Sequence, residues 1–182
     1  MAEGLKKYAT LVNLVAFHIG WLACVIGAGK GRPSLGPLVV PVLVALQVAL
    51  ISQNSRRESC FIIATALFGF LADTGMIYGE VYEPVRDVMP PPLIPLWMVA
   101  LWVNFGAALN LSLRWFRGRY AAAALFGAAG GPFAYFAGAK LKAVVLNPDP
   151  LRSFAVLVIV WAVSVPFLYF LSEKIVGSNG SR

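Results

Sequence analysis

Three ionisable side chains in this sequence lie within or at the end of long apolar runs: Asp73, His18 and Lys140. A charge near the centre of a bilayer costs roughly 2.5–3.5 kcal/mol on insertion scales, so such a group normally faces protein or water and has a partner. A carboxylate can form an ion pair with an amine, and imidazole can accept a proton near neutral pH. These three groups are therefore the first candidates for a functional site.

Asp73 lies about five residues before the expected end of its helix, which is roughly 7 Å below the membrane interface. Lys140 closes a helix that we expect to run in the same direction, so both residues reach the same half of the membrane. In one interpretation they form an ion pair. In the other, Lys140 extends toward the headgroups, and Asp73 is protonated or hydrogen-bonded to Thr74 or Tyr78.

The only histidine, His18, lies near the middle of the first apolar run. One imidazole cannot form a multi-histidine metal site, and Cys24, six residues later, lies on another face of the helix. We therefore expect no metal, and nothing in the sequence indicates a cofactor. His18 is either a hydrogen-bonded packing residue, the commoner role, or a proton acceptor that shares a cavity with Asp73.

Four neutral amides also lie within apolar runs: Asn13, Gln47, Asn104 and Asn110. Such amides usually form hydrogen bonds between helices, worth around 0.6–2 kcal/mol each. Asn104 follows Trp97 by seven residues and so lies on the same helix face. That face is either a packing surface, which we favour, or the wall of a cavity.

The fifth apolar run contains two stripes of small residues at four-residue spacing, a pattern that permits close helix approach. The stripes are Ala123, Gly127 and Gly131, and Gly130, Ala134 and Gly138. We expect this helix to be central in the bundle and broken at Gly130, Gly131 and Pro132, because proline lacks an amide hydrogen and clashes with the preceding turn. A break would free carbonyl groups that can line a cavity, and the alternative is a kink covered by neighbouring helices.

The composition excludes a water-soluble domain. Of the 182 residues 59% are hydrophobic and 13% are charged, whereas a soluble domain has about 45–50% apolar residues and about a quarter charged. The net charge of +7 comes from short basic clusters between apolar runs, without the aromatic-interleaved basic patch of a nucleic-acid interface. We therefore expect a membrane protein that binds no nucleic acid.

Six runs are long and apolar enough to cross a bilayer, and a crossing run must be helical because an unpaired backbone group in hydrocarbon is costly. The fold class is thus all-α, a single transmembrane domain in which six transmembrane helices form a bundle with a broken fifth helix. The expected helices cover residues 8–28, 35–52, 59–78, 93–113, 120–139 and 153–171.

Lysine and arginine counts predict the orientation. Nine of these residues lie on the side of the membrane that holds both chain ends, and six lie on the other side. Because cytoplasmic loops carry the excess of basic residues, we expect both termini in the cytoplasm.

Four strings in the sequence resemble a bacterial inner-membrane family known as domain of unknown function number twenty-eight seventy-eight. The strings are NLVAFHIGWLACVIG, ADTGMIYGEVYEP, PLWMVALWVNFGAALNLSL and GGPFAYFAGAKL. The resemblance covers nearly the whole chain. It implies a small multi-pass protein of the inner membrane, in the company of fatty-acyl modification proteins such as methyltransferases similar to cyclopropane fatty acid synthase. The characteristic positions that it implies here are Asn13, Trp21, Cys24, Asp73, Asn110, Gly131, Pro132, Tyr135 and Lys140.

We therefore expect a polar cavity formed by Asp73, Lys140, His18, Tyr135, Asn104, Gly131 and Pro132. The favoured function is binding of a lipid or acyl chain, or an accessory role in lipid modification, with membrane lipids as partners. A small proton-coupled transporter is the first alternative, and with only six helices it would require a homodimer.

An intramembrane enzyme is a further alternative, with His18 as base and Asp73 as the group that orients it. No nucleophile is evident, since Cys24 and Ser112 are candidates only by residue type, and we do not favour catalysis. The remaining alternative is a structural subunit that binds another membrane protein through its small-residue stripes.

Overall fold

The computed structural model describes residues 8–85 and 88–177. The described chain contains six long helices, a single 3₁₀ turn and two short strands, so the predicted all-α class is confirmed. The helices are α2 (Ala9–Gly29), α3 (Leu35–Leu50), α4 (Ser55–Tyr78), α5 (Leu96–Leu109), α6 (Tyr120–Lys140) and α7 (Pro150–Ile175), and the 3₁₀ turn is η1 (Arg114–Phe116).

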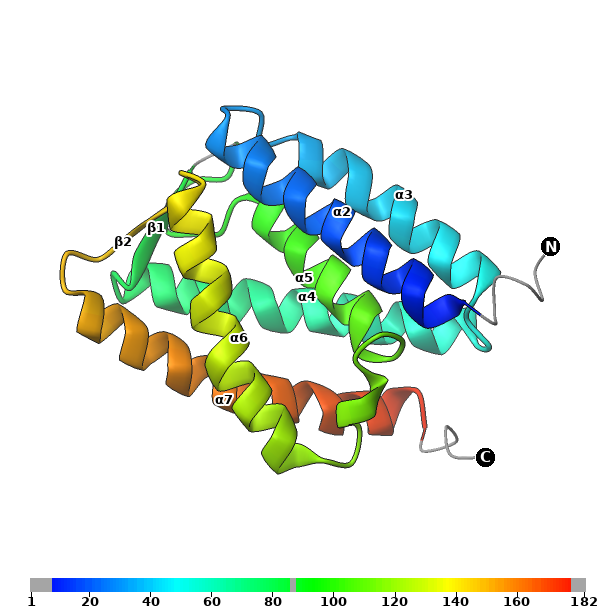
Figure 1. Ribbon diagram of the computed structural model, residues 1–182. Coiled ribbons are helices and arrows are strands. Elements are labelled where there is room, and N and C mark those ends of the chain that lie inside the picture. Colours follow the sequence, from blue (N-terminus) through cyan, green and yellow to red (C-terminus); the bar gives the residue numbers. More distant parts are fainter. Residues whose placement is uncertain (1–7, 86–87, 178–182) are drawn as a thin grey trace.

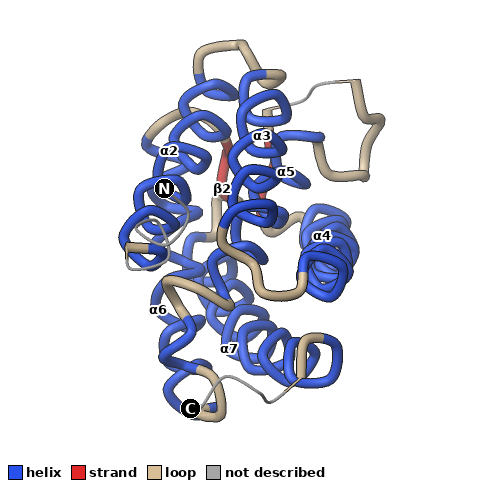
Figure 2. Tube along the Cα trace, turned by 90° about the vertical axis from the view of Figure 1, so that its right-hand side faces the viewer, coloured by secondary structure: helices blue, strands red, loops and turns tan. Residues whose placement is uncertain are grey.

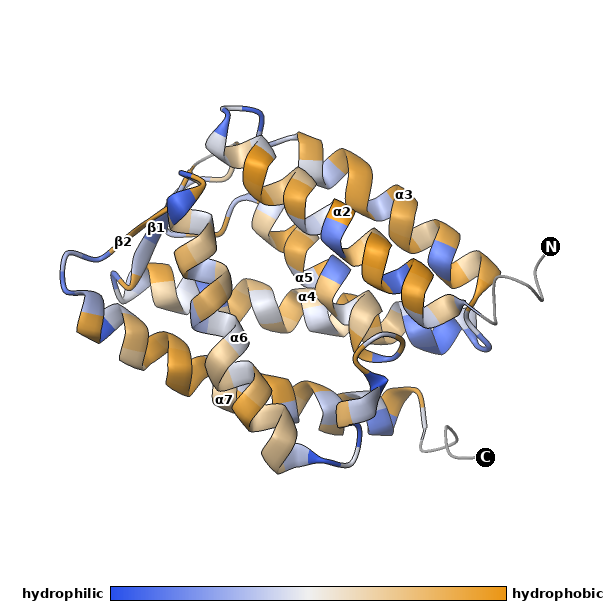
Figure 3. Cartoon of the chain, in the orientation of Figure 1, coloured by the Kyte–Doolittle hydropathy of each residue, from blue (hydrophilic) through white to orange (hydrophobic). Residues whose placement is uncertain are grey.

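Among the described residues, four helices are long and apolar enough to cross a membrane: α2, α4, α6 and α7. The apolar helices α3 and α5 have 16 and 14 residues, or about 24 and 21 Å, against a hydrocarbon core of about 30 Å. Large apolar side chains such as Leu38, Leu67 and Leu125 are exposed on the outside of the bundle. Hydrophilic residues gather mainly at its two ends (Figure 3). This distribution is that of a membrane protein.

Helix α5 is shorter than the predicted range 93–113. It begins at Leu96, directly after Pro95, and the proline-rich segment before it disfavours helical backbone. It ends at Leu109, and the C-cap residue Asn110 donates its side-chain amide to the carboxylate of Glu58 at 3.2 Å. Nine of its 14 residues are buried, which makes α5 the most enclosed helix of the bundle.

The predicted break in the fifth helix is wrong, because α6 is helical without interruption from Tyr120 to Lys140. Pro132 removes one backbone hydrogen bond, but neighbouring packing offsets that loss, as is common for prolines in membrane helices. Gly127 and Gly131 lie directly against Trp161 of α7. Helices α6 and α7 therefore approach closely beside the Gly-Gly-Pro sequence.

The prediction that this glycine-rich helix is central is also wrong. Helices α2, α3 and α4 all pack against α5, whereas α6 packs mainly against α7. Figure 1 shows α2, α3 and α5 running side by side, with α6 crossing α7 below them. Figure 2 shows the same division from the side. Contact between the two groups is made chiefly where α7 packs against α4.

A small antiparallel ribbon, absent from the sequence prediction, closes one end of the bundle. Its strands are β1 (Tyr82–Pro84) and β2 (Val144–Leu146), with Tyr82 opposite Leu146. Three-residue strands far apart in the chain carry no alternation that a sequence reading can detect. Helix α2 begins and α7 ends at the opposite end of the bundle (Figure 1). The ribbon places Tyr82 over the interior of the helices, where it is 3% exposed.

The predicted hydrogen bonds between helices are confirmed for the buried amides. The Asn13 amide donates to the Gln47 side chain at 2.6 Å, and Gln47 donates to the Ala107 carbonyl at 2.9 Å, which joins α2, α3 and α5. Asn104 donates to the Phe17 carbonyl at 2.8 Å. These bonds fix the helix positions around α5.

We expect Gln47→Leu to lower the free energy of unfolding by about 1–2 kcal/mol, because it removes two buried hydrogen bonds between helices. Unfolding by titration with sodium dodecyl sulfate, followed by circular dichroism, measures the change. The matched variant is Gln53→Leu, at an exposed position outside the helices. An equal loss of stability in both variants would contradict the role of Gln47 as a link between helices.

Candidate functional site

A cavity of about 330 Å³ lies among the helices, within the range of small-molecule sites. Nine of its 20 lining residues are aromatic, and most of the others are apolar or glycine. The rim includes exposed side chains from two helices that make few contacts with each other, His18 on α2 and Phe133 on α6. The cavity therefore opens on the side of the bundle, between two helices that are long enough to cross the membrane.

Asp73 of α4 forms the polar floor of this cavity and is 1% exposed. The Trp102 indole of α5 donates to its Oδ2 at 2.8 Å, and the Tyr135 hydroxyl of α6 donates to its Oδ1. One carboxylate thus joins three helices. The sequence predicted Asp73 and Tyr135 as site residues, and the structure brings them into direct contact.

Glycines allow the aromatic walls to approach the helices. A Cβ atom at Gly69 would lie 1.9 Å from the Trp102 ring, and one at Gly131 would lie 2.1 Å from the Trp161 ring. The two indole rings stack on each other, with centroids 5.0 Å apart and planes 7° apart. Gly131, a predicted site residue, therefore lines the cavity by accommodating Trp161.

His18 lies on the rim of the same cavity and is exposed. Its Nδ1 lies 2.7 Å from the Leu14 carbonyl of its own helix. A carbonyl accepts only, so this contact requires a proton on Nδ1 and leaves Nε2 of the neutral ring as an acceptor. His18 is thus oriented locally and makes no hydrogen bond to Asp73.

The expected pairing of Asp73 with Lys140 is not found. Both carboxylate oxygens are bound by Trp102 and Tyr135, and Lys140 is exposed at the end of α6, outside the cavity lining. The alternative partners are not used either. Tyr78 is 80% exposed, and the buried hydroxyl of Thr74 has no hydrogen-bond partner in the described chain.

Two further residues of the predicted cavity do not line it. Asn104 lies over Gly20, where a Cβ atom would be 2.9 Å from the amide, and it donates to the backbone of α2. This is the packing role that we favoured. Pro132 is buried within α6 but is not part of the lining.

The sequence prediction missed Trp102 and Trp161. An interfacial belt explains tryptophans near the ends of membrane helices. These two instead lie near the middle of the predicted runs 93–113 and 153–171. A position in the middle of a run could have indicated that these tryptophans pack inside the protein rather than at the membrane interface.

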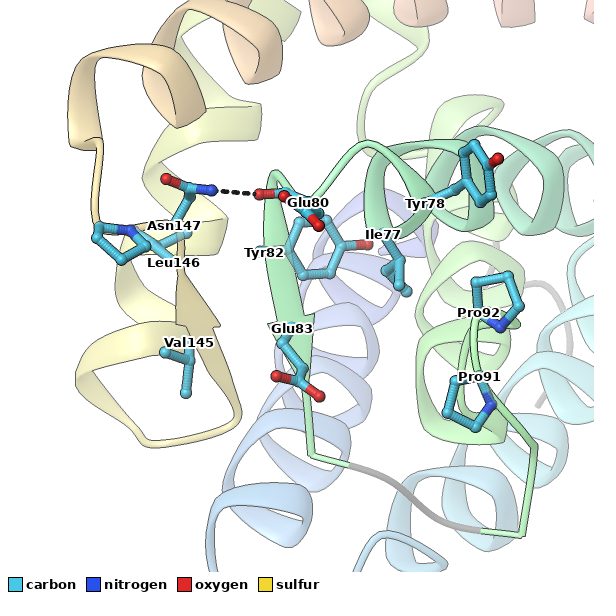
Figure 4. A pocket seen from close by; sticks show the side chains of 11 residues that line it. Ile77, Tyr78, Glu80, Tyr82, Glu83, Pro91, Pro92, Val145, Leu146 and Asn147 are labelled. Atoms are coloured by element: carbon cyan, nitrogen blue, oxygen red, sulfur yellow. Dashed lines mark hydrogen bonds between the residues drawn. The ribbon is translucent and has the colours of Figure 1, made fainter.

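A second hollow of about 530 Å³ lies at the ribbon end, between strand β1 and the Pro91–Pro92 segment (Figure 4). Its carboxylates, Glu80 and Glu83, are exposed, so water can solvate their charges. The Asn147 amide donates to the backbone carbonyl of Glu80 at 2.8 Å, which closes one side. Because water solvates these carboxylates, their presence does not require a functional explanation, whereas the buried Asp73 does. We therefore place the candidate site at the smaller aromatic cavity.

The fold and the cavity define an all-helical membrane protein with an aromatic chamber around a single buried carboxylate. The chain belongs to the family described as protein of unknown function (DUF2878), whose model matches residues 10–167. This match confirms the resemblance that the sequence motifs indicated. No curated protein and no solved structure matches the chain.

Proposed function

We propose that this protein binds the acyl chain of a membrane lipid in the aromatic cavity, as an accessory to lipid modification in the bacterial inner membrane. The observation that carries the proposal is the side opening of an apolar cavity between α2 and α6. Through such an opening an acyl chain enters without leaving the hydrocarbon, and it exchanges lipid contacts for contacts with aromatic side chains. A volume of about 330 Å³ suits one chain segment rather than a whole diacyl lipid.

The proposal includes a topology in which all six helices cross the membrane and both termini are cytoplasmic. Consecutive helices run in alternating directions, and the start of α2 and the end of α7 lie at the same end of the bundle, which supports an even number of crossings (Figure 1). The excess of basic residues on the side of the termini supports their cytoplasmic location. In this topology the β1–β2 ribbon faces the periplasm.

Asp73 has a structural role in this proposal. Its hydrogen bonds fix Trp102 and Tyr135, and Trp102 in turn supports the stacked ring of Trp161. Three walls of the cavity therefore depend on one carboxylate. A preformed wall lowers the entropic cost of binding a flexible chain.

Proton-coupled transport is a second candidate, favoured by the presence of His18 and Asp73 in one cavity. The transport hypothesis relied on a broken helix as gate and on Lys140 as a third titrating group. Because α6 is continuous and Lys140 lies outside the cavity lining, lipid binding is the better supported function. Proton flux into proteoliposomes that is abolished by Asp73→Asn would favour transport instead.

The enzyme hypothesis receives the least support. Neither Cys24 nor Ser112, the nucleophiles considered by residue type, lines the cavity. Ser112 instead donates its backbone amide to the Asn13 side chain at 3.1 Å. His18 therefore has neither candidate nucleophile beside it in the cavity.

The Gly130→Leu variant tests chain binding, because Gly130 lines the cavity and a Cβ atom there meets only Phe126, at 4.0 Å. We expect the leucine to displace roughly two methylene groups of the ligand, at about 0.8 kcal/mol each, and to weaken binding about tenfold. Four of the five tryptophans line the cavity, so quenching of intrinsic fluorescence by a mid-chain brominated acyl ester reports occupancy.

The matched control is Gly75→Leu, another helical glycine with no atom within 4 Å of the added Cβ and no place in the cavity lining. The brominated ester should quench the fluorescence of the Gly75→Leu variant as strongly as that of the unmodified protein. Two of the cavity tryptophans, Trp97 and Trp102, are at most 4% exposed, so bulk lipid does not reach them. Equal quenching in the Gly130 and Gly75 variants would contradict acyl-chain binding in this cavity.

A further inference from the structure

Asp73 is a buried carboxylate whose described contacts are all with neutral groups. The Trp102 indole and the Tyr135 hydroxyl donate to its two oxygens, and the Tyr82 hydroxyl also interacts with it. No lysine or arginine is among the described residues that line the cavity, and His18 at the rim is bonded to its own helix. Acidic side chains are almost never fully buried unless they are paired. The ionised form of Asp73 therefore lacks a counter-ion among the described residues.

The rings around this carboxylate form a cluster that can attract positive charge. Trp102 and Trp161 stack with their centroids 5.0 Å apart, and the Phe105 centroid lies 6.0 and 5.5 Å from theirs. The Tyr135 centroid is 6.4 Å from that of Trp161. These four rings, the aromatic cluster, line the same cavity as Asp73. A cation within about 6 Å of a ring centroid is attracted to the negative face of the ring.

We propose that the cavity binds a hydrophobic organic cation of the quaternary ammonium class, with its charge close to Asp73 and against the aromatic cluster. This ligand goes beyond the acyl chain of the proposed function, although it occupies the same chamber. A quaternary group suits the site because it has no N–H that needs an acceptor. A primary ammonium has three such donors, whereas both carboxylate oxygens already accept hydrogen bonds here.

The burial of Asp73 favours the aromatic cavity over the hollow at the ribbon end. That hollow also contains carboxylates, but Glu80 and Glu83 are exposed, so water weakens their attraction for a cation. The attraction between two charges grows as the effective dielectric constant around them falls. A cation in the apolar chamber therefore gains more from one buried carboxylate than from two solvated ones.

Two probes of equal shape test the inference: para-bromobenzyl trimethylammonium, and the neutral hydrocarbon in which carbon replaces its nitrogen. Bromine quenches indole fluorescence, and four of the five tryptophans line the cavity. We expect Asp73→Asn to raise the ratio of the cation's dissociation constant to that of the hydrocarbon about tenfold to a hundredfold, because it removes the buried negative charge. Partitioning of each probe into detergent cancels when this ratio is compared between proteins. An unchanged ratio in a folded Asp73→Asn protein would overturn the inference.

Phe105→Leu is the second variant, and it keeps the inference testable if Asp73→Asn does not fold, as judged by circular dichroism. It removes one ring of the aromatic cluster and retains an apolar side chain, so the same ratio should rise about threefold to tenfold. An unchanged ratio in this variant also contradicts the inference.

The matched control for loss of a carboxylate is Glu83→Gln, which lies in the hollow at the ribbon end and outside the lining of the aromatic cavity. It should leave the ratio unchanged. If Glu83→Gln raises the ratio and Asp73→Asn does not, the cation binds at the ribbon end and the inference is wrong. It is also wrong if the cation does not quench the unmodified protein. Quenching by the brominated acyl ester is measured separately and still decides acyl-chain binding.

Discussion

Replacing Asp73 with alanine is expected to lower the free energy of unfolding by about 3–5 kcal/mol. The change leaves the Trp102 indole and the Tyr135 hydroxyl buried without an acceptor, and each unsatisfied donor costs about 1–3 kcal/mol. The empty space left by the carboxyl group adds to the loss. Titration with sodium dodecyl sulfate, followed by circular dichroism, measures the change.

The control for this prediction is Asp73→Asn. The asparagine oxygen can accept from Trp102, and its amide can donate to the Tyr135 oxygen, so both contacts can be kept with the hydroxyl turned. We expect most of the stability to remain. A protein that tolerates alanine as well as asparagine would show that the carboxylate does not hold α4, α5 and α6 together.

Gly69→Ala is expected to be similarly damaging, by about 3 kcal/mol or more, although it adds only one methyl group. The new Cβ would lie 1.9 Å from the Trp102 ring, and inserting atoms into a packed interior forces side chains and backbone to move. Displacement of Trp102 would also break its hydrogen bond to Asp73. The indole fluorescence spectrum and the unfolding titration should change together.

The same substitution at Gly75, six residues further along α4, provides the comparison. No heavy atom lies within 4 Å of a Cβ there, and alanine favours the helix by up to about 1 kcal/mol over glycine. Gly75→Ala should therefore be neutral or slightly stabilising. Equal effects at the two positions would mean that the contact between Gly69 and Trp102 does not limit how closely α4 and α5 approach.

The positions of the helices could be predicted because the bilayer fixes the length of an apolar run. The buried amides could be predicted as links between helices because an amide in hydrocarbon requires a partner, and Gln47 and Asn104 both have one. Close packing is confirmed for one of the two small-residue stripes, the one that contains Gly127 and Gly131. One stripe packs against α7 through Gly131, and Gly130 of the other lines the cavity.

The partners of Asp73 could not be predicted, since Trp102 and Tyr135 follow it by 29 and 62 residues on other helices. Which faces of α4, α5 and α6 meet depends on how each helix is rotated, and a single sequence does not specify that rotation. The same applies to Lys140, which belongs to the correct helix but lies beyond the cavity. The close contact of Gly131 with Trp161 likewise joins two different helices.

The division of the bundle, in which α6 packs mainly on α7, has a consequence for biosynthesis. The ribosome releases α2 to α5 first, and these helices already contain Asp73 and Trp102. Tyr135 and Trp161 reach the membrane only with the final helical hairpin. A nascent chain that stops before Tyr120 therefore has an incomplete chamber, which is finished only at the last step of insertion.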